Sequence, residues 1–336
     1  MSRILWIATG LSPDVTGIER VILALAEELQ RRCVVEYREI SVLVDSNASW
    51  PNQLRESGAS VIPATRGRWE RTRVDRETCL VHNFGGGLFP RPTAGSKPTL
   101  MYSVYDWGPF RDPSMPAGAR AAWEQATSRG IRRADLVHFL NEHLANSVPR
   151  WIPAPRRSIV AYPVSSLARL PPSWRLADPA SPPHAIFVWA VSARKRVDLI
   201  TEMAKTTQSH VVLIGPGTES LNYPPWVLGR GRLGDSELSR AMDQSRALLL
   251  VSSYEGFGIP ILEAATRGIV SVVSPEVEAT LPRSLSALVE VVSADSPADF
   301  ADGIRRAGLR RGLVRFDPEG LMAPLVDAYA EVLGTP

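Results

Sequence analysis

The sequence predicts an α/β protein with two doubly wound, mostly parallel sheets. Short apolar runs alternate with segments of helical apolar spacing, which is typical of such sheets. The alternation occurs twice, on either side of a stretch in which nine of the 35 residues from 149 to 183 are proline. The length of 336 residues also favours two domains. We expect an N-terminal domain over 1–165, a proline-rich connection over 166–184, and a C-terminal domain over 185–315. Residues 316–336 are expected to form a helix that packs back toward the N-terminal domain.

Apolar runs in the first half predict six strands, and the segments between them predict helices. The strands are expected at residues 4–8, 34–44, 60–63, 79–82, 99–104 and 136–140. Thr16 and Glu19 have the Thr-x-x-Glu spacing of a capping box, which predicts the start of the first helix. Further helical segments are expected over 53–57, over 117–132 and at Glu142.

Small or polar residues stand where several of these predicted strands end. They are Gly10, His82, Tyr105 and Asp106. In doubly wound sheets, ligands bind beyond the carboxyl ends of the strands. These residues are therefore candidates to line a site, while His82 is explained equally well as a strand-end histidine with no functional role.

The second half repeats the alternation. Strands are expected at residues 186–190, 211–214, 247–251, 270–273 and 287–291. One helix is expected to begin at Val197, and a second is expected to have Asp235 as its N-cap and to run to about residue 246. Two more helices, over 297–307 and 318–333, are expected to close the chain.

The stretch 252–263 is where the second half predicts a binding site. It joins a buried strand to a helix, and it contains Gly256 and Gly258 in the loop between them. A glycine loop at a helix N-terminus suits an anion such as phosphate. The loop is bracketed by Glu255 and Glu263, and carboxylates do not bind phosphate. They fit sugar or ribose hydroxyls, since a carboxylate can accept two hydrogen bonds from a diol.

Composition and motifs argue against several other classes of protein. No apolar run approaches the ~20 residues of a membrane span. The two cysteines, Cys33 and Cys79, give no disulfide framework and no metal-ligand spacing. Together with a start that lacks a signal-peptide pattern, they favour a cytoplasmic protein. No nucleic-acid-binding pattern is present. The G-x-G-x-x-G match at 229–234 does not lie in a first strand–helix turn, so a nicotinamide cofactor is not expected.

Positive charge is concentrated in the first half of the chain. Residues 1–170 carry 22 Lys and Arg against 16 Asp and Glu, whereas residues 171–336 carry 16 against 19. One interpretation is an ordinary solvated surface rich in arginine. The other is contact with an anionic membrane surface or an acidic acceptor, which would make the protein peripheral at the inner face of the membrane.

The segment from Glu255 to Glu263 resembles the E-x7-E motif of retaining GT-B glycosyltransferases of glycosyltransferase family 4. The residues that follow, 263–272, are similar to that family's Glu-Ala-x-x-x-Gly-x-x-x-Val. Residues 187–200 resemble its strand and Arg-Lys segment for the donor phosphate, and residues 231–238 resemble its Gly-x-x-x-Asp-x-Glu-Leu loop. Residues 16–21 resemble its first loop and helix, so the likeness covers nearly the whole chain.

This resemblance implies a GT-B architecture, in which two Rossmann-like domains face a cleft. The C-terminal domain would bind a nucleotide-diphosphate sugar, and the N-terminal domain would bind a glycan, lipid-linked or small-molecule acceptor. Glu263 would hold the ribose hydroxyls and Glu255 would contact the transferred sugar. Lys195, helped by Arg194, would neutralise the diphosphate leaving group, because preorganised cations stabilise developing negative charge.

The resemblance assigns further residues to the two substrates. Backbone N–H groups would contact the donor phosphates, and these belong to Phe257, Gly258 and Ile259. Other donor contacts are expected from Gly17, Gly215 and Leu233. The acceptor side would include His82, Tyr105 and Asp106. Because the sequence contains no Asp-x-Asp triplet, the metal-dependent alternative fold of glycosyltransferases is not expected, and no metal site is predicted. No cofactor is expected either, since the nucleotide-diphosphate sugar would be a co-substrate.

Some positions differ from the family's pattern and leave two alternatives open. Tyr105 stands where many members have histidine, and Trp189-Ala190 stand where Gly-Arg is usual. A tyrosine can donate a hydrogen bond but cannot become a cation near neutral pH. The alternatives are a catalytically silent, nucleotide-sugar-binding partner of another transferase, and a GT-B epimerase or phosphorylase.

Overall fold

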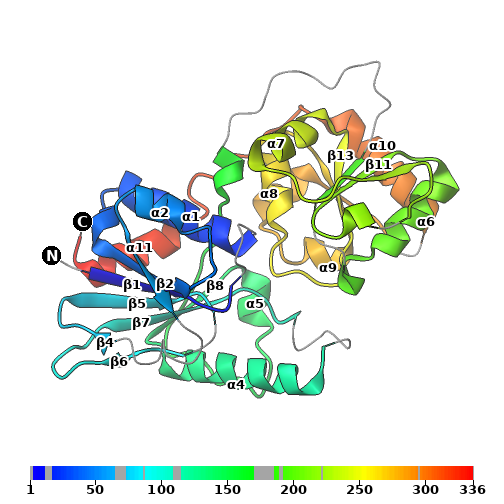
Figure 1. Ribbon diagram of the computed structural model, residues 1–336. Helices are drawn as coiled ribbons and strands as arrows, with labels where there is room; N and C mark the ends of the chain where they lie inside the picture. The colour runs from blue at the N-terminus through cyan, green and yellow to red at the C-terminus, as the bar shows by residue number, and fades with distance from the viewer. Residues whose placement is uncertain are drawn as a thin grey trace. The chain divides into compact units, whose positions relative to one another are not determined.

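The computed structural model describes residues 3–11, 17–64, 73–85, 88–108, 115–169, 185–188, 192–220, 222–293 and 296–335. The chain divides into two compact units. Unit 1 comprises Met1–Ser166 and Glu319–Pro336, and unit 2 comprises Leu167–Pro318. Each unit is built on one large parallel sheet with helices on its faces (Figure 1). The predicted α/β class with two doubly wound sheets is therefore confirmed.

The sheet of unit 1 has seven strands in the order β3-β2-β1-β5-β7-β8-β9. Their bounds are β1 Arg3–Ala8, β2 Ile40–Asp45, β3 Ser60–Ala64, β5 Thr78–Asn83, β7 Thr99–Val104, β8 Leu136–Phe139 and β9 Ser158–Val160. Every pairing in this sheet is parallel; Trp6, for example, pairs with Val42 on one side and His82 on the other. A separate two-stranded sheet joins β4 (Arg73–Val74) to β6 (Arg91–Pro92).

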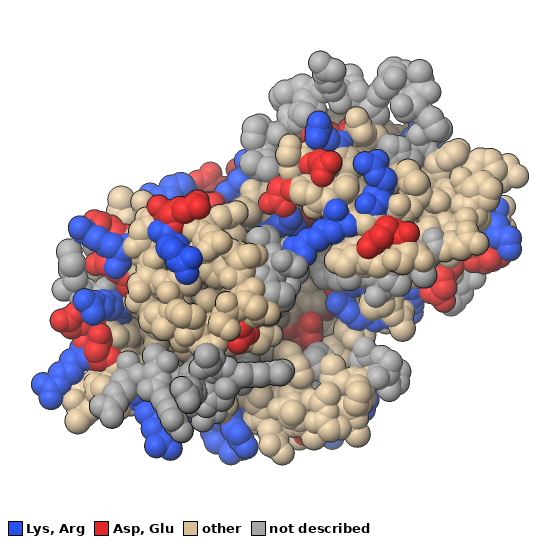
Figure 2. Space-filling view, viewed as in Figure 1, with Lys and Arg blue, Asp and Glu red and all other residues tan. Residues whose placement is uncertain are grey.

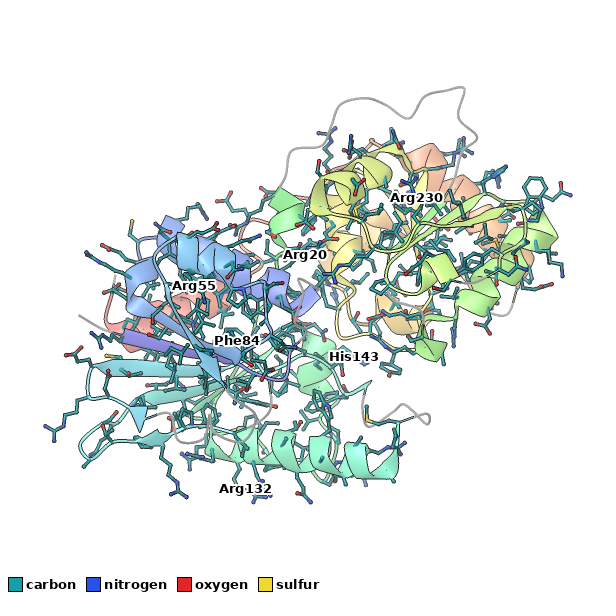
Figure 3. All side chains as sticks on the ribbon, viewed as in Figure 1. Arg20, Arg55, Phe84, Arg132, His143 and Arg230 are labelled. Carbon is teal, nitrogen blue, oxygen red and sulfur yellow. The ribbon has the colours of Figure 1, made fainter. Side chains whose placement is uncertain are left out.

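Helices cover both faces of this sheet. They are α1 Gly17–Arg31, α2 Asn52–Glu56, α4 Ala117–Arg133, α5 Glu142–Asn146 and α11 Ala323–Leu333. Figure 1 shows α1 and α11 on one face and α4 on the other. In α1, the apolar residues from Val21 to Leu29 are buried while Ile18 is half-buried, so one face of the helix packs against the sheet. Phe84, labelled in Figure 3, lies inside unit 1 with its ring centroid 5.5 Å from that of Trp6.

The sheet of unit 2 has six strands in the order β12-β11-β10-β13-β14-β15, again all parallel. Their bounds are β10 Ala185–Val188, β11 Val211–Ile214, β12 Val227–Gly229, β13 Ala247–Leu250, β14 Ser271–Val273 and β15 Val289–Val291. The helices are α6 Val197–Thr207, α7 Asp235–Gln244, α8 Ile259–Ala265, α9 Pro275–Glu278 and α10 Pro297–Arg310. Central strand β13 is completely buried, as its unbroken apolar sequence predicts.

Several predicted boundaries are wrong. Residues 34–44 are not one strand: the Val34 amide bonds to the Leu29 carbonyl (2.9 Å) at the end of α1, and the strand starts only at Ile40. Strand β9, which lies within the predicted N-terminal domain and pairs with β8, was not predicted from the proline-rich stretch. Asp235 lies in the first turn of α7 and Gly234 is the N-cap. The last helix begins at Ala323, after a turn, and not at residue 318.

Two further differences concern elements that the sequence pattern did not indicate. Strand β12 has only three residues, and Leu228 at its centre is exposed, so its apolar pattern is weak. Helix α9 is a single turn. Two predictions fall partly outside the described residues. They concern Thr16 of the capping box and residues 189–190 of the strand predicted at 186–190.

A buried chain of hydrogen bonds links α11 to the sheet of unit 1. His138 Nε2 donates to the Ala161 carbonyl (2.9 Å), so its Nδ1 accepts from Ser103 Oγ (2.8 Å). Ser103 in turn accepts from His82 Nε2 (2.8 Å), and His82 Nδ1 accepts from the Tyr329 hydroxyl (2.5 Å). Both imidazoles must be neutral for this order of donors and acceptors to hold. Burial lowers the pKa of His82 well below 6.5, with the charge of His138 adding to the effect, and burial lowers the pKa of His138 to about 4.

The protein should therefore lose stability as the pH falls from 6.5 toward 4. A histidine whose pKa is lower in the folded than in the unfolded state stabilises the fold fully above its unfolded pKa, and less as the pH falls. For His138 alone the loss would approach roughly 3 kcal/mol at pH 4. Urea unfolding at pH 7, 6, 5 and 4.5 measures how the free energy of unfolding depends on pH. His138→Gln should flatten the pH dependence, whereas His210→Gln, a control for a partly exposed histidine of unit 2, should leave it unchanged. Equal slopes for the His138 variant and the wild type would contradict the prediction.

None of the helices in the described parts of the chain has both the length and the apolar character that a membrane span needs.

Candidate functional site

The loops that follow β10 and β13 meet at the carboxyl edge of the sheet of unit 2. The two strands are parallel neighbours, so their carboxyl ends lie side by side. The Ser253 amide donates to the Arg194 carbonyl at 2.8 Å, which joins the loops directly. Tyr254 adds a second link, because the Arg194 guanidinium lies over its ring, 5.2 Å from the centroid. This pairing brings the predicted basic segment to the predicted Glu255.

This edge holds a buried charged group formed by Lys195, Arg194 and Glu255. We call this group the cation pair and its carboxylate. Lys195 is completely buried, and its Nζ contacts Glu255 Oε1. Arg194 Nη1 lies 3.2 Å from Glu255 Oε2, so each carboxylate oxygen faces one cation. The side chain of Glu255 is 3% exposed and that of Arg194 is 23% exposed. The group has a net charge of +1 and reaches solvent on the Arg194 side.

The electrostatics of the group keep Glu255 ionised. Burial alone would raise the pKa of Glu255, because it penalises the charged form. The charges of Lys195 and Arg194, with the hydrogen bond from Lys195, outweigh burial and lower the pKa of Glu255 below its usual value. Glu255 is therefore a carboxylate at neutral pH, able to orient both cations or to accept hydrogen bonds.

The loop after β13 is held from behind and turns sharply into α8. Ser274 Oγ donates to the Ser252 carbonyl (2.8 Å), and Thr280 Oγ1, which donates to the Val277 carbonyl (2.7 Å), lies 3.4 Å from the Phe257 carbonyl. Gly258, the N-cap of α8, has a φ of +82°, and a Cβ there would lie 2.8 Å from Leu250 Cδ2. Only glycine satisfies both conditions, which explains its place in the motif.

Glu263 lies in the second turn of α8 and is only 1% exposed. All seven residues of this helix are buried. Four residues later, the side chain of Arg267 donates from Nη1 to the Glu263 carbonyl at 2.8 Å. Glu263, which the sequence predicts to be a site carboxylate, thus lies inside unit 2, and the buried cation Arg267 lies beside it.

The two other predicted donor contacts of unit 2 come from loops next to this group. In the sheet, β11 lies beside β10 and β12 beside β11, so the loops that follow them continue the same edge. The Gly215 amide donates to the Gly231 carbonyl at 2.8 Å and fastens these loops together. Leu233, two residues further on, is half-buried. The structure therefore brings Gly215, Lys195 and Glu255 to one edge of the sheet.

The remaining predicted residues belong to unit 1. Gly17 is the first residue of α1, and Gly10 follows β1 with its amide bonded to Asp45 Oδ2 at 2.7 Å. Tyr105 and Asp106 follow β7, and Asp106 Oδ1 accepts from the Gly108 amide (2.8 Å). Burial raises the pKa of Tyr105 well above 10, so its hydroxyl is neutral.

His82 is the predicted acceptor-side residue whose surroundings differ most from expectation. It is completely buried, and Tyr329 and Ser103 occupy its two ring nitrogens. In this arrangement neither nitrogen is open to a ligand. The acceptor-side role of His82 stays a prediction, as do the roles of the other site residues.

Sequence reasoning missed three residues that shape these surroundings. Tyr254 stacks on Arg194 and stands next to Glu255 in the sequence, so adjacency to the motif could have indicated it. Arg267 is one helical turn after Glu263, a spacing that places both on one helix face. Asp243, its ion-pair partner at 3.4 Å, comes from α7 and has no sequence signal of its own.

No group of three or more His, Cys, Asp or Glu in the described ranges is arranged to hold a metal ion.

Comparison with solved structures identifies the fold. Sucrose-phosphate synthase from Thermosynechococcus elongatus is similar over 99% of this chain and 94% of its own, with a TM-score of 0.67 and 13% identity. A glycosyltransferase from Rickettsia africae is similar over 100% of this chain and 99% of its own, with a TM-score of 0.65 and 12% identity. HepE from Anabaena, solved with UDP and glucose, is similar over 99% of this chain and 95% of its own, with a TM-score of 0.62 and 13% identity. These structures have the GT-B fold, and the chain shares it.

The sequence comparison is narrower. Residues 182–308, which are 127 of the 336 residues, match the family model described as Glycosyl transferases group 1. The match includes both Lys195 and the segment from Glu255 to Glu263. No curated protein matches the chain.

Proposed function

We propose that the chain is a retaining, metal-independent glycosyltransferase that moves a sugar from a nucleotide-diphosphate donor to an acceptor hydroxyl. The observation that carries this proposal is the cation pair and its carboxylate. A completely buried lysine is costly unless it is paired, and here two cations share one carboxylate at the ligand-binding edge of a parallel sheet. The remaining positive charge suits a diphosphate.

The proposed roles follow from the charges at this edge. As the nucleoside diphosphate leaves, negative charge develops on its β-phosphate, and Lys195 with Arg194 would stabilise it from fixed positions. Glu255, which holds the two cations, would also contact the hydroxyls of the transferred sugar. Glu263 would hold the ribose, and the amides of Gly258 and its two neighbours, Phe257 and Ile259, would contact the phosphates. Gly215, Leu233 and Gly17 complete the proposed donor contacts.

The proposed chemistry takes place on one face of the sugar. The bond from the anomeric carbon to the β-phosphate oxygen breaks, and the bond to the acceptor oxygen forms on the same face, so configuration is retained. The acceptor proton passes to an oxygen of the departing diphosphate. We assign no side-chain nucleophile. The comparisons support donor binding in general terms, since HepE was solved with UDP and with UDP-glucose.

A thermal-shift screen against UDP, GDP, ADP and dTDP and their sugars tests the donor assignment. A ligand at 100 times its dissociation constant should stabilise the protein by ~2.7 kcal/mol. With the donor known, product analysis should show transfer with retained configuration, unchanged by EDTA. A protein that no nucleotide stabilises would contradict the proposal. One that binds a nucleotide sugar but neither transfers nor hydrolyses it would be a silent binding partner.

Glu263→Ala should weaken binding of the nucleotide found in that screen by about 10- to 100-fold, the worth of hydrogen bonds to a charged acceptor. The measurement is titration calorimetry with the nucleoside diphosphate. Unchanged affinity would show that Glu263 does not hold the ribose.

For the acceptor we propose a glycan or lipid-linked molecule bound by unit 1, with the protein in the cytoplasm or at the inner face of the membrane. Trp123 on α4 and Trp151 are 45% and 58% exposed. Figure 2 shows Lys and Arg side chains on part of the lower edge of unit 1, and Arg132, labelled in Figure 3, lies in the last turn of α4. Exposed tryptophan and arginine side chains on one unit suit an anionic lipid surface. Flotation with vesicles of phosphatidylglycerol and phosphatidylcholine at low salt tests this, and equal binding to vesicles of phosphatidylcholine alone would contradict it.

A further inference from the structure

Arg267 is the most enclosed arginine next to the candidate site, and sequence analysis gave it no role. Its side chain is completely buried. It follows α8, whose end is marked by Gly268 at a φ of +68°. A buried guanidinium is retained only where its donors find partners and its charge is balanced.

The guanidinium joins three segments of unit 2. Nη1 donates to the Glu263 carbonyl at 2.8 Å. Nη2 donates to Ser239 Oγ at 3.0 Å in α7 and to the Leu167 carbonyl at 3.2 Å. Nε lies 3.4 Å from Asp243 Oδ1, also in α7. One side chain thus fixes the end of α8 against α7 and against the start of unit 2.

The contact with Glu263 is unusual for a helix end. The carbonyl of Glu263 is not bonded by the Arg267 amide, which donates to Ala264 instead. The side chains of Arg267 and Thr266 bond it, at 2.8 and 3.0 Å. The side chains of Arg267 and Thr266 therefore hold the backbone of α8 at the residue that carries the Glu263 carboxylate.

Charge gives Arg267 a second effect on Glu263. The carboxylates of Asp243 and Glu263 both act on the guanidinium, and both residues are at least 95% buried. A carboxylate enclosed to this degree needs a nearby cation to stay charged. The charged form is acceptor-only, so each of its two oxygens can accept from one hydroxyl of a diol.

We propose that Arg267 is a positioning residue that holds Glu263 in the orientation and the charged state needed to recognise a ribose diol. This inference rests on the proposed function, in which Glu263 binds the donor ribose. It predicts that Arg267 determines the discrimination between ribonucleotides and 2′-deoxyribonucleotides, without itself touching the nucleotide.

The test compares the affinities of UDP with 2′-deoxy-UDP and of GDP with 2′-deoxy-GDP by titration calorimetry. Wild type should bind the ribonucleotide of one pair at least about tenfold more tightly, because the deoxy form leaves a charged acceptor without its donor. Arg267→Gln should reduce that ratio to about threefold or less. Arg267→Lys, which keeps the charge but loses the planar fork, should give an intermediate ratio.

A destabilising control separates positioning from packing. Phe300→Leu, at a completely buried site in α10, should lower the melting temperature and leave the ratio unchanged. If Arg267→Gln also loses stability but keeps the wild-type ratio, the positioning role is wrong and the proposed function stands. If wild type binds a ribonucleotide without discrimination, the Glu263 assignment fails, and the role of Arg267 with it. If wild type binds none of UDP, GDP, ADP and dTDP, nor any of their sugars, the proposed function fails too.

Discussion

Replacing Glu255 with glutamine should reduce sugar transfer by roughly 10²–10³-fold and, at the same time, tighten the binding of the nucleoside diphosphate by about tenfold. The amide keeps the size of the carboxylate but removes its charge. Lys195 and Arg194 then present two positive charges without a counter-ion, which favours a diphosphate in the ground state. The sugar loses its charged acceptor, so transfer falls.

The same substitution should also cost stability in the absence of ligand. Lys195 is completely buried, and removing one member of a buried ion pair costs roughly 3–5 kcal/mol. The nucleoside diphosphate should restore much of this loss by mass action. The measurements are urea unfolding with and without ligand, calorimetric affinity, and the transfer rate.

The matched control is Glu276→Gln. Glu276 pairs with Arg196, the next residue of the same basic segment, at 3.5 Å, but its side chain is 44% exposed. An exposed pair contributes less than about 1 kcal/mol, so stability, affinity and transfer should change little. Weaker diphosphate binding in Glu255→Gln than in wild type would contradict the proposed arrangement of charges.

Replacing Lys195 with methionine should have the opposite effect on affinity. Methionine fills the buried space but removes one of the two cations that face the proposed diphosphate. We expect diphosphate binding to weaken by about 10- to 100-fold and transfer to fall by roughly 10²–10³-fold, since the charge that develops on the leaving group is no longer stabilised.

Lys205→Met is the control for this change. Lys205 is 65% exposed on α6 and lies 3.7 Å from Glu202, so it tests the loss of one positive charge away from the site. The affinity of this variant for the nucleoside diphosphate and its rate of sugar transfer should match those of wild type. If Lys195→Met also matches wild type in both, Lys195 is structural and the leaving-group role is wrong.

Sequence patterns predicted the parts of this molecule that depend on local order. Strand β13 and the turn at Gly258 are encoded within twelve residues, as an unbroken apolar run and a glycine that must adopt a positive φ. Glu255 was singled out because it follows a predicted strand, Lys195 was assigned by the family resemblance, and the neighbouring strands β10 and β13 bring the two together. Strand β12 was missed because it has only three residues, which is too few to show a pattern.

The rest depends on contacts between distant segments. His82 and Tyr329 are 247 residues apart in the chain, and no local pattern indicates that a histidine will be sealed by a tyrosine from the last helix. Arg267 was missed for a related reason. An arginine at a helix end usually lies in solvent, and only the packing of α7 against α8 shows that this one is enclosed.

The division of the chain also determines the order in which its parts can fold during synthesis. Unit 2 is inserted into unit 1, because the segment from Glu319 to the end belongs with the first 166 residues. All residues of unit 2 therefore leave the ribosome before α11 does, and domains generally fold as units once their residues are available. Until Tyr329 emerges, the imidazole of His82 lacks the hydroxyl that pairs with it in the finished protein. Helix α11, which is made after all of unit 2, thus supplies the partner of a histidine in the first sheet.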